Sequence, residues 1–460
     1  MTSIDPARLK RHGPDEPAGG SYTLYWMSAA VRTQDNEALE FAIERANSTT
    51  RRLAVLFVLD PSYPEAQQRH FEFLRQGVDD VATGLAQRHV KFVVRIGDLV
   101  DQVVDVAAEA TEIITDRTYL RHQRRALAPI VERSGKPVTE VETAVIVPTH
   151  VTSQKREYAA RTIRPRIHDH LESFLRLPET VTLEKNSRNL SIAGATEAEI
   201  GAAIAGLDDG DSVQTRTRLF SGGQFQARAT LDRFIDTLLP TYDGERNKPE
   251  SGNVSHMSMY LHFGHISPVR VAAEITASGA PKDMIDSYIE ELVVRRELGF
   301  NYVEFEPDYD KYSALPEWAR TTLDEHRDDP RDHVYTRSEF ERAQTHDRYW
   351  NAAMIQLRET GYLHNYMRMY WGKKILEWSN TPEYAYRTVL TLNNRHLYDG
   401  RDPNSFGNVG WVFGLWDRAW QERDVFGKTR SMTASGLERK ADPDAYVRQI
   451  SEVTGLEVLA

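Results

Sequence analysis

Hydrophobic and polar positions follow two different patterns along the chain, and the change between them falls near residue 150. Before that point, short runs of apolar and β-branched residues alternate with amphipathic stretches. Such an alternation predicts buried strands of a parallel sheet with helices on both of its faces. The predicted strands are Thr23–Trp26, Leu53–Leu59, Val90–Ile96, Glu112–Asp116 and Val138–Val147.

Three amphipathic stretches between these strands are predicted to be helices: Asp35–Asn47, Phe71–Arg88 and Asp98–Ala110. Asp35 and Asp98 are the predicted N-caps, because a short carboxylate can accept hydrogen bonds from the first free N–H groups. A ligand in this part of the chain would lie beyond the carboxyl ends of the strands. Neither GxGxxG nor GxxxxGK[ST] occurs, so a dinucleotide loop or a triphosphate loop of those kinds is not supported.

The stretch from about 148 to 225 is more polar and predicts a connector with one short helix near Glu197–Ala205, followed by GLDDGDS (Gly206–Ser212). After it, apolar residues recur at helical spacing. The first such series is Leu231, Phe234, Ile235, Leu238 and Leu239. We therefore predict an α/β Rossmann-like parallel-sheet domain over 20–150, a connector over 151–222 and an all-α domain over 223–460.

Composition narrows the choice of function. The 460 residues include no cysteine, which excludes disulfides, thiolate nucleophiles, Cys-ligated zinc and cysteine-bound iron–sulfur clusters. The net charge of −11 argues against a protein that coats nucleic acid non-specifically, but a local basic patch is compatible with it. The polar N-terminus has no signal-like apolar core, and no apolar run approaches the roughly 20 residues of a membrane span. We expect a cytoplasmic protein, associated with the nucleoid if the source is prokaryotic.

Hydrolytic and metal sites find little support. There is no GxSxG motif, so a serine hydrolase is not favoured. His262 and His265 lie three residues apart, and His168 and His170 two apart, but neither pair has a third ligand at a familiar spacing. Structural or surface roles fit these histidines better.

Two tryptophans, Trp371 and Trp378, stand seven residues apart in YWGKKILEW. Seven residues make two helical turns, which would place both indoles on one face about 10 Å apart along the axis. Such a pair is either a core stripe or a short relay for electrons, and the helix alone does not distinguish them. Basic residues accompany it: Arg368, Lys373 and Lys374.

The segment Leu392–Met432 combines amides, carboxylates and indoles. It is too polar and too rich in glycine and asparagine to predict a core helix. Amides and carboxylates suit the edge of a heterocycle, and indoles suit its face. The segment is therefore either a cofactor or base pocket, or a long structured loop. Its basic residues, with the neighbouring indoles, form the mixture that holds phosphates and stacks bases: Arg418, Arg423, Lys428 and Arg430.

Taken together, the motifs resemble class II cyclobutane pyrimidine dimer photolyases, within the photolyase and cryptochrome superfamily. MRMYWGKKILEW and DGRDPNSF occurring in one chain make the resemblance specific, and it spans nearly the whole sequence. The other matching stretches are YWMSAAVRTQDNEAL, SQKREYAARTIRPRI, RNKPESGNVSHMSMYLHFGHIS and EELVVRREL.

The resemblance implies an N-terminal domain that can hold an antenna pigment, either a deazaflavin or a folate, and a helical domain that holds a U-shaped FAD. It implies that Arg368 and Asp399 form an ion pair beside the isoalloxazine ring and that Asn393 faces flavin N5. The remaining residues that it implies for FAD are Tyr242, Ser255, His256, Met257, Ser258 and Asp402. Hydroxyl and backbone N–H groups ahead of a helix also suit a pyrophosphate on chemical grounds.

The same resemblance implies a deoxyribodipyrimidine photo-lyase, a monomer that acts on UV-damaged DNA under blue light. Trp350, Trp371 and Trp378 would carry electrons to the oxidised flavin. Glu291 would hydrogen-bond a flipped dimer and Trp411 would stack on it. The implied DNA contacts are Arg246, Asn247, Glu291, Trp411 and Arg430. Excited reduced FAD would give an electron to the dimer and take it back after the ring opens. The alternative is a cryptochrome-like FAD photoreceptor without repair activity.

Overall fold

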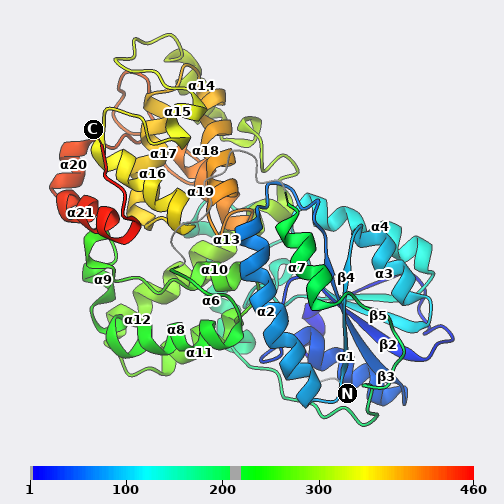
Figure 1. The fold of residues 1–460 in the computed structure, drawn as a ribbon. Coiled ribbons are helices and arrows are strands. Elements are labelled where there is room, and N and C mark those ends of the chain that lie inside the picture. The colour runs from blue at the N-terminus through cyan, green and yellow to red at the C-terminus, as the bar shows by residue number, and fades with distance from the viewer. Residues whose placement is uncertain (1–3, 208–218, 460) are drawn as a thin grey trace.

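The computed structural model describes residues 4–207 and 219–459. Figure 1 shows an α/β part in blue and cyan beside a helical part in green to red. The predicted fold class is confirmed. The sheet has the order β1-β6-β5-β2-β3-β4, and only β1 runs antiparallel to its neighbour. Its strands are β1 (Leu9–His12), β2 (Tyr22–Met27), β3 (Arg52–Leu59), β4 (Lys91–Ile96), β5 (Ala110–Asp116) and β6 (Val138–Val141).

Helices cover both faces of this sheet, as the strand pattern predicts. Residues of α1 and α2, such as Phe41 and Val81, share one apolar cluster, and residues of α3 and α4, such as Val103 and Ile130, share the other. These four helices are α1 (Glu37–Ser48), α2 (Gln68–Gln87), α3 (Leu99–Ala107) and α4 (Arg121–Ser134). Among the described residues, no helix is long and apolar enough to cross a membrane.

Three local predictions in this part need correction. Asp98 caps α3 as predicted, but the cap of α1 is Asn36, whose side chain accepts from Leu39 N. Asp35 instead has φ 49 and turns its carboxylate to Arg270. β6 ends at Val141, because Glu142 turns away to accept hydrogen bonds from the Thr149 N–H and the Tyr119 hydroxyl. The antiparallel edge strand β1 was not predicted, since its sequence LKRH is polar.

The connector contains more helix than predicted. α7 (Glu197–Ala205) matches the predicted short helix, with Thr196 and Glu199 in a capping box. The prediction missed α5 (Thr149–Thr152) and the long α6 (Ala160–Phe174), in which Ile163 and Ile167 are buried beneath a basic outer face. In GLDDGDS, residues 208–212 lie outside the described residues.

The helical part contains two apolar clusters, one centred on α16 to α19 and one on α8 to α13. Between α12 and α13, residues Glu290–Arg295 form a π-helical segment. The helices are α8 (Gln224–Thr237), α9 (Tyr242–Glu245), α10 (Met257–His262), α11 (Pro268–Ala277), α12 (Lys282–Ile289), α13 (Arg296–Phe305), α14 (Glu317–Glu325), α15 (Arg337–Glu341), α16 (Arg348–Thr360), α17 (Asn365–Glu377), α18 (Pro382–His396), α19 (Pro403–Val412), α20 (Ala434–Glu438) and α21 (Pro443–Thr454).

The two parts meet through a tight backbone contact. Gly264 has φ +69, and a Cβ placed on it would lie 1.8 Å from the Ala29 carbonyl oxygen. Arg270 forms two hydrogen bonds with the Asp35 carboxylate across the same boundary, at 2.7 and 2.8 Å. Glycine at 264 is therefore required for the helical part to approach the sheet this closely.

The glycine- and asparagine-rich segment Leu392–Met432 contains a helix that its composition did not predict. Asp402 accepts from Asn404 N, and Pro403 occupies the first turn of α19. Gly407 and Gly410 are buried because Trp416 and Leu415 pack directly against them. The polar residues thus start the helix, while the glycines let indole and leucine side chains approach it.

Candidate functional site

An ion pair between α17 and the loop after α18 lies at the centre of the candidate site. Arg368 Nη2 donates to Asp399 Oδ2 at 2.9 Å, and its Nε donates to the Leu363 carbonyl. Ser405 Oγ donates to the Asp399 carbonyl, which holds the loop against α19. The structure therefore pairs the two residues that were predicted to flank an isoalloxazine ring.

Asn393, the predicted amide beside flavin N5, lies in the last turn of α18 with 6% of its surface exposed. Its Nδ2 donates to Asn394 Oδ1 at 3.2 Å. This bond fixes which end of the Asn393 amide is engaged by protein and leaves its oxygen available as an acceptor.

The residues predicted at a pyrophosphate lie at the start of α10. Tyr288 donates from its hydroxyl to Ser255 Oγ, and its ring lies 5.3 Å from that of Tyr242. His256 has φ 54 and contacts Tyr362 edge to face at 4.7 Å. Burial lowers the pKa of His256 to about 4, so its imidazole is neutral at physiological pH. Within this group, Met257 is buried and Ser258 is exposed.

Several enclosed polar atoms in this region have no hydrogen-bond partner among the described residues. They supply both acceptors and donors, and buried polar groups are nearly always satisfied in folded proteins. They are Asp399 Oδ1, His256 Nδ1, His364 Nε2 and Trp371 Nε1. With the neighbouring rings, such a mixed set fits a flat heterocycle that both donates and accepts along its edge. The residues present therefore fit a flavin.

The three predicted electron carriers form a row in which Trp350, on α16, is the middle member. Trp350 Nε1 donates to the Trp371 carbonyl at 3.0 Å, and its ring centroid lies 6.2 Å from that of Trp378. Trp350, Trp371 and Trp378 have exposed fractions of 0%, 3% and 5%. Trp378 lies at the C-cap, because α17 ends at Glu377. The helical spacing of Trp371 and Trp378 left out Trp350, which comes from another helix and contacts both the Trp371 carbonyl and the Trp378 ring.

Glu291 belongs to the π-helical segment and pairs with Arg246 at 2.9 Å. The Arg246 guanidinium also lies 5.6 Å from the centre of the Tyr242 ring. Asn247, the next residue, is exposed. The structure thus joins two of the predicted DNA contacts to the residues at α10 through Tyr242.

Trp411, the predicted stacking platform, lies in the last turn of α19 with two cations close to its ring. Lys373 Nζ lies 5.3 Å and the Arg430 guanidinium 5.6 Å from its ring centres. Lys373 is fully buried and donates to the Val412 carbonyl, and burial lowers its pKa to about 7. Arg430 also bonds Asp417 and covers Trp420 at 4.1 Å. For Trp420 and the buried Lys373, the only signal in the sequence is their place among aromatic and basic residues.

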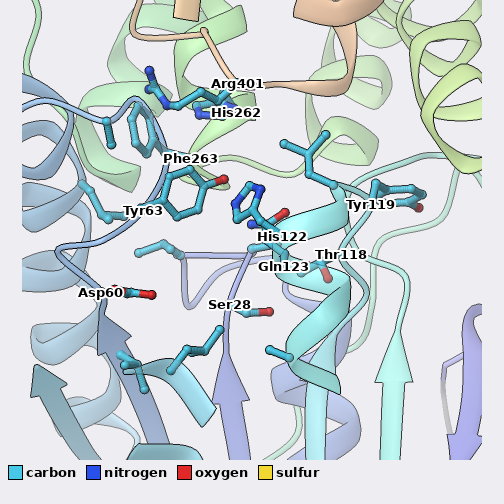
Figure 2. Close-up of a pocket in the computed structure, with 18 of the residues that line it drawn as sticks. Ser28, Asp60, Tyr63, Thr118, Tyr119, His122, Gln123, His262, Phe263 and Arg401 are labelled. Carbon is cyan, nitrogen blue, oxygen red and sulfur yellow. The ribbon is translucent and has the colours of Figure 1, made fainter. Parts of the chain in front are cut away.

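A cavity of about 470 Å³ lies at the carboxyl ends of β2 and β3, between the sheet and residues of the helical part such as Phe263 and Arg401. Figure 2 shows Tyr63 and His122 facing each other there, with His262 and Arg401 above them. The walls are mainly apolar and aromatic, including Trp26, Phe57, Phe263 and Phe300. This is the position at which the strand pattern predicted a ligand.

Asp402 lines this cavity. Its carboxylate accepts from Asn404 N and lies 3.2 Å from His262 Nδ1. Burial works to raise the pKa of Asp402, but the His262 contact and the charge of Arg296 hold it below its ordinary value. Asp402 thus faces this cavity and also caps α19.

Comparison with known proteins connects these features to a family. A DNA photolyase family model matches residues 23–184. The chain is 42% identical over 448 residues to the deoxyribodipyrimidine photo-lyase of Methanothermobacter thermautotrophicus, covering 97% of this chain and 98% of that protein. This chain belongs to the DNA photolyase family. A second photolyase relative, the deoxyribodipyrimidine photo-lyase of Oryza sativa subsp. japonica, is 36% identical, covering 97% of this chain and 90% of that protein. The predicted enzyme class is confirmed.

Solved structures of photolyases and cryptochromes share the fold. The class III photolyase of Agrobacterium tumefaciens superposes with a TM-score of 0.72 at 20% identity, covering 95% of this chain and 88% of that one. The cryptochrome of Synechocystis reaches 0.75 at 16% identity, with 95% and 89% covered. At these identities the likeness establishes the architecture, and the chemistry must be argued from the site.

Proposed function

We propose that this photolyase splits cyclobutane pyrimidine dimers in UV-damaged DNA under blue light, with FAD as its cofactor. The observation that carries the proposal is the joint placement of three groups. These are the Arg368–Asp399 pair with Asn393, the buried tryptophan row, and the cation-flanked indole of Trp411. A photoreceptor would need the first two groups only.

Bound FAD in its reduced state would supply a light-excited electron for the dimer and accept it again after ring opening. The chain's own groups would set its surroundings. Arg368 and Asp399 would flank the ring, and Asn393 would offer a neutral acceptor that adds no titrating charge. Tyr242, with the Ser255–Ser258 stretch, would face the pyrophosphate.

The tryptophan row would pass electrons to the oxidised cofactor and so reduce it. Trp371 would stand nearest the cofactor, Trp350 in the middle and Trp378 at the outer end. Apolar packing around Trp350 keeps water from its indole, and the Trp371 carbonyl accepts its N–H. The row thus conducts without touching the substrate.

The lesion would be bound after leaving the duplex, since its reacting bonds are out of reach inside the helix. Glu291 would accept a hydrogen bond from the dimer, and Trp411 would stack on it. Arg246, Asn247 and Arg430 would brace the strand from which the dimer has left. Because the two arginines would contact phosphates, DNA affinity is expected to fall steeply as the salt concentration rises.

The cavity at the strand ends would hold the antenna pigment, a deazaflavin or a folate. Its aromatic walls suit a planar chromophore, and its polar edge, with His122 Nε2 unpaired among the described residues, offers a group to orient one. An absorption spectrum of the native protein would show FAD and any antenna together.

The test is direct. The photoreduced protein, mixed with dimer-containing DNA under blue light, should restore the pyrimidines, and DNA that stays unchanged contradicts the proposal. Glu291→Ala separates repair from a cryptochrome-like role, because it should slow repair strongly and leave photoreduction intact. If wild type and variant photoreduce but neither repairs, the photoreceptor alternative is favoured.

A further inference from the structure

We propose that Glu65, from the α/β part, is a positioning residue for Asn393 and acts through the side chain of Asn394. The inference rests on the proposed function, since it assigns a partner to the amide proposed to face the flavin. It adds a residue of the α/β part, next in sequence to the cavity-lining Pro64 and Ala66, to the machinery around the cofactor.

Asn394 is the centre of the arrangement, and its amide is saturated on both ends. Its Nδ2 donates to Glu65 Oε2 at 2.7 Å. Its Oδ1 accepts from the backbone N–H of Arg401 at 3.0 Å and from Asn393 Nδ2 at 3.2 Å. Asn394 is 1% exposed, whereas Glu65 reaches it from the surface.

The chemistry of the partners leaves one orientation for both amides. A carboxylate oxygen can only accept, and a backbone N–H can only donate. Glu65 therefore fixes the NH2 end of Asn394, and Arg401 fixes its oxygen. Since that oxygen accepts from Asn393, the NH2 group of Asn393 must point to Asn394. The oxygen of Asn393 is then the end left for an N–H donor such as flavin N5.

The backbone holds Glu65 and Arg401 in unusual conformations for this purpose. Glu65 has φ 58 and Arg401 has φ 61, backbone angles that residues other than glycine seldom adopt. Arg401 also donates from its guanidinium to the Asn394 carbonyl. Strained residues on both sides of one asparagine favour a built hydrogen-bond relay over an incidental surface contact.

Glu65→Ala tests the relay. Without the carboxylate, only the Arg401 N–H still favours this orientation of the Asn394 amide, so Asn393 is held less firmly in its single orientation. If Asn393 stabilises the reduced cofactor through N5–H, the photoreduced protein should reoxidise in air about fivefold faster, the factor for one neutral hydrogen bond. Flavin content and melting temperature, measured on the same sample, show whether the variant is folded and loaded.

Two further variants separate orientation from charge and from domain packing. Glu65→Gln keeps an acceptor for Asn394 and should reoxidise like the wild type. Asp35 also has a positive φ, and its carboxylate crosses the same boundary to pair with Arg270. Asp35→Ala removes that carboxylate and should reoxidise at the wild-type rate. If Glu65→Gln behaves as Glu65→Ala does, or Asp35→Ala is equally fast, the relay is overturned.

A double-mutant cycle with Asn393→Leu gives the decisive result. If Glu65 acts through Asn393, then Glu65→Ala should have no further effect on reoxidation in the Asn393→Leu background. The same fivefold factor in both backgrounds would overturn the relay while leaving the proposed function intact. If Asn393→Leu alone reoxidises as the wild type does, the placement of Asn393 at the flavin fails, and the relay fails with it.

Discussion

The molecule holds two sets of tryptophans in opposite surroundings. Trp350, Trp371 and Trp378 are buried and contact one another's rings or backbone, and the cation of Lys374 lies 5.3 Å from the outermost ring, that of Trp378. Trp411 and Trp420 lie under cations, and Trp420 is 37% exposed. The difference teaches that the same side chain serves two purposes according to its neighbours. An indole packed in a dry row can pass charge, whereas one backed by guanidinium offers a flat face to a base.

Breaking the row at its middle should give the largest effect. Trp350→Phe keeps an aromatic ring but removes the indole that joins Trp371 to Trp378, so most photoreduction of the oxidised flavin should be lost. Repair by chemically pre-reduced protein should continue. Transient absorption and a repair assay on the same sample measure the two activities, and an equal loss of both would show that the row also serves repair.

Removing the platform should produce the converse result. Trp411→Ala should weaken binding of dimer-containing DNA by about fivefold to 150-fold, because base stacking on an aromatic ring contributes about 1–3 kcal/mol. Photoreduction without DNA should stay at the wild-type rate. Titration with labelled dimer DNA gives the affinity, and unchanged binding would assign the stacking role to another ring.

Lys373 makes the platform sensitive to pH, because burial lowers its pKa to about 7. Losing its proton removes a cation beneath Trp411, so affinity for dimer DNA should fall about fivefold between about pH 6 and pH 8.5. Lys373→Met should bind with little dependence on pH in that range. A variant that keeps the full wild-type slope would place the titrating group elsewhere.

The pH dependence of folding stability that Lys373 causes has the opposite direction to that of DNA affinity. Between the folded pKa of about 7 and the ordinary value of 10.5, the unfolded chain holds a proton that the folded chain lacks. Lys373 therefore makes the free energy of unfolding rise with pH across that window. Denaturant titrations of wild type and Lys373→Met should differ in slope there, with the wild type gaining stability toward higher pH.

Trp420 should matter least, since its indole is partly exposed and the guanidinium groups of Arg430 and Arg418 lie 4.1 and 5.0 Å from its ring. Trp420→Ala should weaken DNA binding about threefold, less than the roughly fivefold that corresponds to about 1 kcal/mol for a stacked base. Competition binding at fixed salt is sensitive enough to resolve this. A loss as large as that of Trp411→Ala would make the two indoles equal partners.

Much of the architecture could be predicted from local pattern. The buried strands β2 and β3 are largely apolar runs, and α7 has a complete capping box in its sequence. The polar edge strand β1 has no such pattern, since it is defined by pairing with β6 across the sheet. α19 was not predicted because glycine is usually read as a helix breaker. Here Gly407 allows Trp416 to pack closely against the helix, a contact that only the fold supplies.

The candidate site divides in the same way. Motif similarity identified Arg368, Asp399 and Asn393, and the structure pairs the first two directly. It could not order the tryptophans, because Trp350 comes from a different helix than Trp371 and Trp378. Nor could it identify Glu65, which is 329 residues from Asn394 in sequence. Contacts at such separation depend on how the two parts dock.

A methyl group on Gly264 would collide with the Ala29 carbonyl. The α/β part of this chain is therefore difficult to exchange for that of another protein. A chimera that joins a foreign α/β half to this helical half must reproduce the same close-fitting loop at Ala29 as well as a glycine opposite it. Engineers who wish to change what the cavity binds would therefore do better to redesign its wall in place than to graft a whole domain.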